Sequence, residues 1–148
     1  MKSIAFDIGT VRIGVAASDA LGIIASPVQV YTRGDDPQQD ARDLAAIARA
    51  HGAERIVIGL PVSLRGKMEL AAQQVRQFAD ALRAHVQVEV VLWDERMSTA
   101  IANKAMLLDD VSRAGRRDKV DQVAAAVILQ SYLDAQSGPN TDGECEGR

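Results

Sequence analysis

The sequence predicts an α/β protein with one mixed, five-stranded sheet and helices on both of its faces. Two observations lead to this prediction. Near the N-terminus, three short apolar runs follow one another through short connections, as in an antiparallel meander. After residue 36, helical and strand-like patterns alternate, which is typical of parallel βα units.

The meander is expected to use three short strands. Their ranges are Ser3–Phe6, Ile13–Ala17 and Ile23–Tyr31. Proline cannot donate a hydrogen bond to a neighbouring strand, so Pro27 favours an edge position for the third one.

The second half begins with a helix over Pro37–His51, which has apolar residues at helical spacing. Asp36 suits its N-cap, Pro37 its first turn and Gly52 its end. The remaining expected elements are a doubly buried strand at Arg55–Leu60, a helix at Glu69–Ala84, a strand at Val88–Trp93, a short helix at Thr99–Leu108 and a longer helix at Lys119–Ala135.

The composition is that of an ordinary globular chain, with 148 residues, 47 % hydrophobic and 25 % charged. We expect one domain over residues 1–136 and a disordered polar tail over residues 137–148. No apolar run approaches the roughly 20 residues that span a bilayer, and no secretory signal pattern is seen, so a cytoplasmic location without membrane contact is expected. The single cysteine excludes an internal disulfide and a thiolate metal cluster.

The net charge of −3 does not by itself favour a nucleic-acid partner. Three of the 20 acidic residues lie in the tail, against one of the 17 basic residues, so most of the excess negative charge belongs to the tail. The placement of the charges therefore matters more than their sum.

The first candidate site residue is Asp7, in the segment IAFDIGTVRIGVA. A carboxylate in an apolar strand is costly unless something compensates it. It either accepts hydrogen bonds from the turn that follows, or it holds a metal ion or phosphate. Gly9 allows a close backbone approach in that turn, and Thr10 adds a hydroxyl group.

A second candidate lies in WDERMST, where the last strand ends and a helix is expected to begin. Ligands of open α/β sheets gather at the carboxyl ends of strands. For Asp94 a helix-capping role is favoured. For Glu95 a structural role and a functional role remain equally open.

The third candidate is the segment DKVD, which opens the last expected helix. Asp118 suits the N-cap, and Asp121 in the first turn suits the helix dipole. Asp121 also aligns with Ala125 and Ile128 on the apolar stripe, which points it toward the sheet. Structural and functional interpretations both remain open for this residue.

Basic residues adjoin these acids repeatedly. A charge run is usually only a solvated face, but a polyanion bound over a metal centre would need this arrangement. The candidate nucleic-acid contacts are Arg12, Arg65, Lys67, Arg96, Arg113, Arg116, Arg117 and Lys119. The last four form a basic cluster, which is expected to lie in a loop before the last helix.

Taken together, the segments FDIGTVRIGVA, VIGLP with a following Gly66, WDERMST and KVDQVAAAVIL resemble the YqgF/RuvX family. They occur in the family's order and span about Ser3–Leu133. The resemblance implies an RNase H-like fold, similar to that of the RuvC-type Holliday junction resolvases.

The resemblance implies that Asp7, Glu95 and Asp121 are the catalytic acids and bind Mg²⁺ or Mn²⁺, with Asp118 as an auxiliary ligand. Carboxylates suit these hard cations, and two such ions can stabilise a phosphodiester displacement. One departure stands out. Resolvase-type relatives carry an acid at the end of the fourth strand, where this chain reads GLPVS, so Glu95 must act from the next strand.

The implied activity is a metal-dependent endonuclease that processes the 5′ end of pre-16S rRNA in ribosome biogenesis. Alternatives are a Holliday junction resolvase acting on branched DNA and a non-catalytic RNA-binding assembly factor. DIGT also resembles the phosphate-binding turn of the actin and sugar-kinase superfamily. Those proteins close two such domains over ATP, whereas 148 residues supply one, so ATP binding is the less favoured alternative. Both a monomer and a homodimer are compatible with the sequence, and paired cutting of a junction favours the dimer.

Overall fold

The computed structural model describes residues 1–61, 69–95 and 113–137, and the side chains of residues 113–122 and 137 lie outside that description. The strands are β1 (Ser3–Ile8), β2 (Arg12–Ser18), β3 (Ala25–Thr32), β4 (Arg55–Leu60) and β5 (Glu89–Asp94). The helices are α1 (Pro37–Ala50), α2 (Glu69–Arg83) and α4 (Arg113–Ser137). The expected helix at Thr99–Leu108 and most of the expected tail lie outside the described residues.

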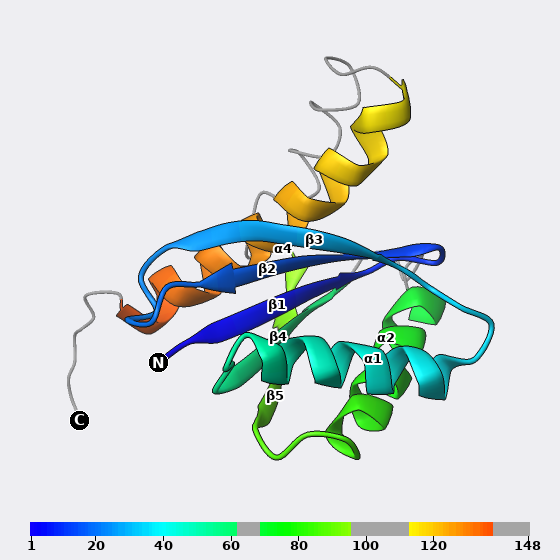
Figure 1. Ribbon diagram of the computed structural model, residues 1–148, viewed down its shortest axis with the longest axis horizontal. Coiled ribbons are helices and arrows are strands. Elements are labelled where there is room, and N and C mark those ends of the chain that lie inside the picture. Colours follow the sequence, from blue (N-terminus) through cyan, green and yellow to red (C-terminus); the bar gives the residue numbers. More distant parts are fainter. Residues whose placement is uncertain (62–68, 96–112, 138–148) are drawn as a thin grey trace.

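The five strands form one mixed sheet in the order β3-β2-β1-β4-β5 (Figure 1). β2 pairs antiparallel with both β1 and β3, which confirms the predicted meander. β4 pairs parallel with β1 and with β5, so the carboxyl ends of these three strands meet at one edge of the sheet. β3 is an outer strand, as Pro27 predicted.

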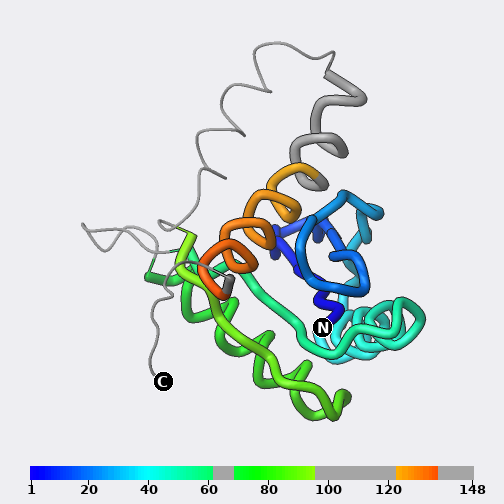
Figure 2. The backbone as a smooth tube through the Cα atoms, turned by 90° about the vertical axis from the view of Figure 1, so that its left-hand side faces the viewer, coloured from blue at the N-terminus to red at the C-terminus, as the bar shows by residue number. Residues whose placement is uncertain are grey.

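Side chains of each central strand alternate between the two faces of the sheet. In β1, Ile4 and Phe6 pack in the core shared with α1 and α2, whereas Ala5 packs in the core shared with α4. The four residues Ile56 to Gly59 of β4 are all buried, as expected for a strand covered on both sides. Figure 2 shows α1 and α2 together on the side of the sheet opposite α4, which confirms helices on both faces.

Helix α1 begins as its sequence predicts. The side chain of Asp36 accepts a hydrogen bond from the backbone N–H of Gln38 at 2.9 Å, and Pro37 occupies the first turn. Gly52 follows the helix with a φ of 67°, a conformation that favours glycine. These signals fix where α1 enters and leaves the face of the sheet.

The second half of α4 is fastened to the sheet by polar contacts. Gln130 accepts a hydrogen bond from the backbone N–H of Ala25 and donates one to the backbone carbonyl of Ile23. Tyr132 Oη accepts one from Arg55 at 2.6 Å, and its ring meets Trp93 edge-on at 5.3 Å. This half of the helix is therefore fixed against β3, β4 and β5.

The start of α4 differs from the prediction. The sequence predicted a loop through the basic cluster, with Asp118 as N-cap and a helix from Lys119, but the helix begins at Arg113. Arginine, alanine and lysine are good helix formers, and a single Gly115 in a helix costs only about 1 kcal/mol, so the cluster continues the helix. Asp118 is accordingly an internal helical residue. None of the helices among the described residues has the length and apolar character needed to cross a membrane.

Candidate active site

Asp7 lies near the end of β1, at the edge where the parallel strands terminate. Asp7 is only 5 % exposed. Because Asp7 follows Ala5 by two residues, strand alternation places it on the face that α4 covers. The β1–β2 turn begins two residues later and is closed by a hydrogen bond from Gly9 N to the carbonyl of Arg12 at 2.9 Å. A Cβ at Gly9 would lie 2.5 Å from that carbonyl oxygen, so the turn requires glycine.

Glu95 follows β5 directly and is 8 % exposed. Its side chain lies against Gly59 of β4, since a Cβ built there would be 3.0 Å from Glu95 Oε2 and 3.3 Å from its Cγ. The same Cβ would lie 2.7 Å from Cδ1 of Ile128 on α4. Gly59 thus leaves the space through which Glu95 extends over β4, the strand that separates β5 from β1.

The strand order brings the two acids to the same edge of the sheet. One strand, β4, separates the strands of Asp7 and Glu95, so their backbones are about 10 Å apart. Trp93 and Val91 pack in the core beneath α4, and alternation puts Glu95 on that face with Asp7. The neighbouring Asp94 falls on the other face, which favours Glu95 over Asp94 as the partner of Asp7.

A cleft of about 700 Å³ opens at this edge of the sheet, and both acids line it. Further lining residues come from the β1–β2 turn, the β3–α1 connection, the start of α1 and one side of α2. They include Thr10, Arg33, Gln38, Gln74, Gln77 and Phe78. The described lining of the cleft therefore offers carboxylates, neutral amides, one cation and apolar side chains.

The third expected acid lies on α4. Asp121 precedes Ile128 by seven residues, or two helical turns, so by spacing it occupies the same face of the helix about 10 Å further along. Ile128 sits over the end of β4, whereas Tyr132 bonds to Arg55 at its start. The helix therefore runs past the carboxyl edge toward Asp121, whose side chain lies outside the described residues.

The expected basic contacts are only partly described. Arg12 starts β2 opposite Thr32 and is half-buried. Arg65, Lys67 and Arg96 lie outside the described residues, whereas the backbones of Arg113, Arg116, Arg117 and Lys119, like that of Asp118, lie in α4.

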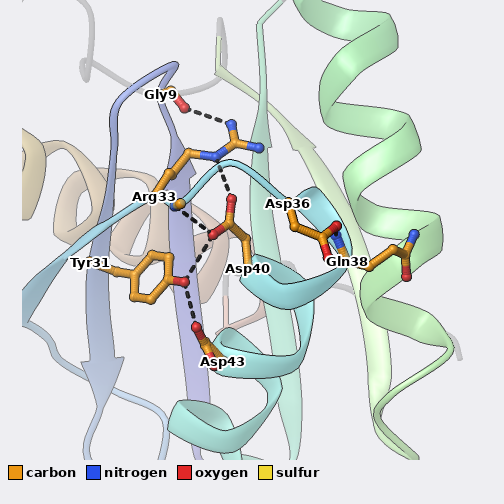
Figure 3. Close-up of polar contacts among 8 residues, drawn as sticks. Gly9, Tyr31, Arg33, Asp36, Gln38, Asp40 and Asp43 are labelled. Carbon is orange, nitrogen blue, oxygen red and sulfur yellow. Dashed lines mark hydrogen bonds and ion pairs between the residues drawn. The ribbon is translucent and has the colours of Figure 1, made fainter.

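One charged network beside the cleft was not predicted. Arg33 donates from Nε to Asp40 at 3.1 Å, and the side chain of Asp40 is 1 % exposed (Figure 3). Gly34 N and the hydroxyl of Tyr31 also donate to Asp40, each at 2.9 Å. The sequence did contain a signal for this network, because Asp40 lies on the same buried side of α1 as Leu44.

The network controls the ionisation of its members. Burial opposes the ionisation of Asp40, but the hydrogen bonds from Gly34, Arg33 and Tyr31 together hold its pKa below the ordinary value of 3.8. Burial and the two neighbouring carboxylates, Asp43 and Asp40, raise the pKa of Tyr31 well above its usual value. Asp40 is thus a carboxylate and Tyr31 a neutral hydroxyl at physiological pH.

The donor chemistry of Asp7 and Glu95 suits Mg²⁺ or Mn²⁺, which prefer oxygen ligands. Two nearly buried carboxylates are costly unless a cation or hydrogen bonds compensate them. Among the described side chains no group of three potential metal ligands occurs, and Asp7 and Glu95 supply two. These residues fit a divalent cation if a third ligand comes from elsewhere.

The mixed sheet, the helices on both faces and the acids at its carboxyl edge define a protein of the RNase H-like class. The family model RuvX, described as "Holliday junction resolvase", matches residues 1–135. This chain belongs to the RuvX family.

Full-length relatives support the assignment. A Myxococcus xanthus protein named "Putative pre-16S rRNA nuclease" is 44 % identical over 142 residues, covering 96 % of this chain and 93 % of that protein. A protein of the same name from Halalkalibacterium halodurans is 39 % identical over 137 residues, covering 92 % and 98 %.

Solved structures agree in fold. Thermus thermophilus RuvC in complex with a Holliday junction matches with a TM-score of 0.59 at 17 % identity, over 93 % of this chain and 96 % of that one. Fowlpox virus resolvase with its junction DNA matches with a TM-score of 0.53 at 11 % identity, over 93 % and 100 %. The predicted RNase H-like fold is confirmed.

Proposed function

We propose that this protein is a metal-dependent endonuclease that hydrolyses phosphodiester bonds in the precursor of 16S rRNA. The observation that carries the proposal is the pair Asp7, in β1, and Glu95, directly after β5, two nearly buried acids that line one cleft. Gly59 leaves the space through which the Glu95 side chain extends over β4, toward the side on which β1 lies. The names of the full-length relatives favour pre-16S rRNA as the substrate.

In this proposal Asp7 and Glu95 hold Mg²⁺ or Mn²⁺ together with Asp121, and Asp118 is an auxiliary ligand. The bound metal supplies activation of a water nucleophile and stabilisation of charge on the phosphate. The chain itself holds Asp7 in β1, Glu95 at the end of β5 and Asp121 on α4, and admits the nucleic acid to the cleft. Thr10, at the tip of the β1–β2 turn, orients a phosphate or a ligand carboxylate in the same proposal.

The basic residues serve binding in the same proposal. Arg12 lies next to the turn, and the basic cluster of α4 extends the helix that carries Asp121. Contacts of this kind follow the phosphate backbone and depend on salt rather than on sequence. Arg65, Lys67 and Arg96 adjoin the ends of β4 and β5 in the sequence and are expected to take part. A cytoplasmic location accords with precursor rRNA as the substrate.

The test compares wild type with Asp7→Asn, which keeps the size of the side chain and removes its charge. Asp80→Asn is the matched control, because Asp80 is an exposed acid of α2 that pairs only with its neighbour Arg83 among the contacts described. Each protein is incubated with a precursor of 16S rRNA and with a four-way DNA junction, in Mg²⁺ or Mn²⁺. Wild type and control are expected to cut the RNA, whereas Asp7→Asn loses at least about 100-fold in rate.

Junction resolution is the second candidate, favoured by the description of the family model. It requires paired, symmetric cuts, and hence two active sites related by a two-fold axis. Symmetric cutting of the junction together with intact RNA would replace the rRNA proposal by this one.

A non-catalytic role in ribosome assembly predicts a different result. If wild type cuts neither substrate and Asp7→Asn still restores growth to cells that lack the gene, the nuclease proposal fails. An assembly factor needs the basic surface but not the acids.

A further inference from the structure

Arg33, in the connection between β3 and α1, holds the β1–β2 turn from two directions. Its Nη1 donates to the carbonyl of Gly9 at 2.9 Å (Figure 3). Its backbone N–H donates to the carbonyl of Val11 at 2.9 Å. Gly9 and Val11 are the two residues on either side of Thr10. The tip of the turn is therefore attached to a neighbouring segment, although Thr10 and Val11 are themselves exposed.

Arg33 can hold the turn because its own position is fixed. Its Nε donates to Asp40, whose carboxylate also accepts from Gly34 and Tyr31. The guanidinium lies 5.4 Å from the ring centroid of Phe78 on α2, within the range of a cation–π contact. The side chain of Arg33 thus connects the turn beside Asp7 to both α1 and α2.

We propose that Arg33 is a positioning residue: it fixes the β1–β2 turn, and through it Asp7 and Thr10, relative to the cleft. This inference rests on the proposed nuclease function. A hairpin tip with exposed residues fluctuates readily when few contacts restrain it. A shift of 1 Å in a catalytic group can cost roughly 100-fold in rate, so the restraint matters for catalysis.

Arg33 also lines the cleft, so a direct contact with a substrate phosphate is the competing explanation. Its charge, however, is already paired with the buried carboxylate of Asp40, which weakens its attraction for a phosphate. Loss of a positioning residue lowers kcat, whereas loss of a phosphate contact made equally in the ground and transition states raises KM. The two roles are therefore separable.

The decisive variant is Arg33→Lys. Lysine keeps the positive charge but lacks the planar fork that donates to Asp40 and Gly9 together. Arg49→Lys is the matched control. Arg49 lies at the other end of α1, and its Nη1 also donates to a backbone carbonyl, that of His85. Asp40→Asn provides a second variant, which weakens the anchor and leaves Arg33 in place.

The first measurement is backbone hydrogen exchange of the peptide that covers residues 5–14, which needs no activity. Arg33→Lys is expected to speed exchange in this turn by about 10-fold, with a smaller increase in Asp40→Asn and none in Arg49→Lys. The second measurement is cleavage kinetics. In Arg33→Lys, kcat should fall by about 10- to 100-fold while KM for the nucleic acid stays within about 3-fold.

Unchanged exchange in the turn of Arg33→Lys would overturn the inference, and so would a raised KM with an unchanged kcat. If Arg33→Lys does not fold, Asp40→Asn decides the matter by the same two measurements. If wild type itself cleaves no nucleic acid, the proposed function fails, while the exchange measurement still tests whether Arg33 restrains the turn.

Discussion

Replacing Gly59 by alanine tests the role of Glu95 most directly. The added methyl carbon would lie 2.7 Å from Cδ1 of Ile128 and 3.0 Å from Oε2 of Glu95. Carbon atoms prefer about 3.5–4.0 Å, so Ile128 must move by roughly 1 Å and the carboxylate by several tenths of an ångström. Both atoms are the ends of side chains, so the backbone of β4 can stay in place.

Two separate effects are expected from this one methyl group. Ile128 is fully buried, and overpacking of this kind costs about 1–3 kcal/mol of the free energy of unfolding. Displacement of the Glu95 carboxylate should lower the cleavage rate by about 10- to 100-fold, given the sensitivity of catalysis to ångström-scale shifts. Urea denaturation measures the first effect, and cleavage of the RNA precursor measures the second.

The double variant Gly59→Ala with Ile128→Val separates the two effects. Valine lacks the Cδ1 atom, so the clash with helix α4 is relieved while the close approach to Glu95 remains. We expect the double variant to recover most of the stability of wild type and little of its activity. Ile128→Val alone is the control and should be active, with a cost of about 0.5–1.5 kcal/mol.

Two outcomes would refute this reasoning. Wild-type cleavage by Gly59→Ala would show that Glu95 does not need its place over β4, and its assignment as the middle acid would fail. Full recovery of activity in the double variant would attribute the slower cleavage to Ile128 rather than to the carboxylate.

Three further variants test other parts of the molecule. Asp40→Asn should cost about 1.5–3 kcal/mol at pH 7. Because the folded-state pKa of Asp40 lies below 3.8, the part of this cost that comes from the ionised carboxylate should shrink as the pH falls through that folded value, and urea denaturation at a series of pH values from 7 downward measures it. Neutralising the arginines of the 113–117 segment should weaken nucleic-acid binding and reduce the log–log salt slope by about 0.7–0.9 for each phosphate that is no longer bound, and an unchanged slope would exclude a role of these arginines in phosphate binding. Tyr132→Phe removes the 2.6 Å hydrogen bond from Arg55 far from the acids, and should cost about 1 kcal/mol in urea denaturation with no change in cleavage.

Much of the fold could be predicted because local patterns were consistent with it. The meander followed from three short apolar runs, α1 from Asp36 and Pro37, and the doubly buried β4 from its unbroken apolar run. Each of these signals lies within a few residues of the element it specifies. The start of α4 was predicted wrongly, because Gly115 and the arginines were interpreted as a loop.

The site was harder to predict, since its parts meet only in three dimensions. Asp7 stood out as a charge in an apolar strand, but Glu95 could not be separated from Asp94 without knowing which face each occupies. Gly59 was noticed only as part of a motif, although a glycine inside a buried strand indicates close approach of another group. Arg33 gave no local signal, because its partners lie at residues 9 and 40.

The way α4 is fastened has a consequence for how its length can vary. Gln130 and Tyr132 fix the rotation of the helix about its axis, and each residue along a helix turns by about 100° and rises by about 1.5 Å. A single insertion or deletion between Asp121 and Gln130 would therefore carry Asp121 to a different side of the helix. Substitutions on the outer surface of this segment do not change the side of the helix on which Asp121 lies. The segment between Asp121 and Gln130 can therefore change in composition but not in length, because its number of residues determines where Asp121 lies relative to the anchored half of the helix.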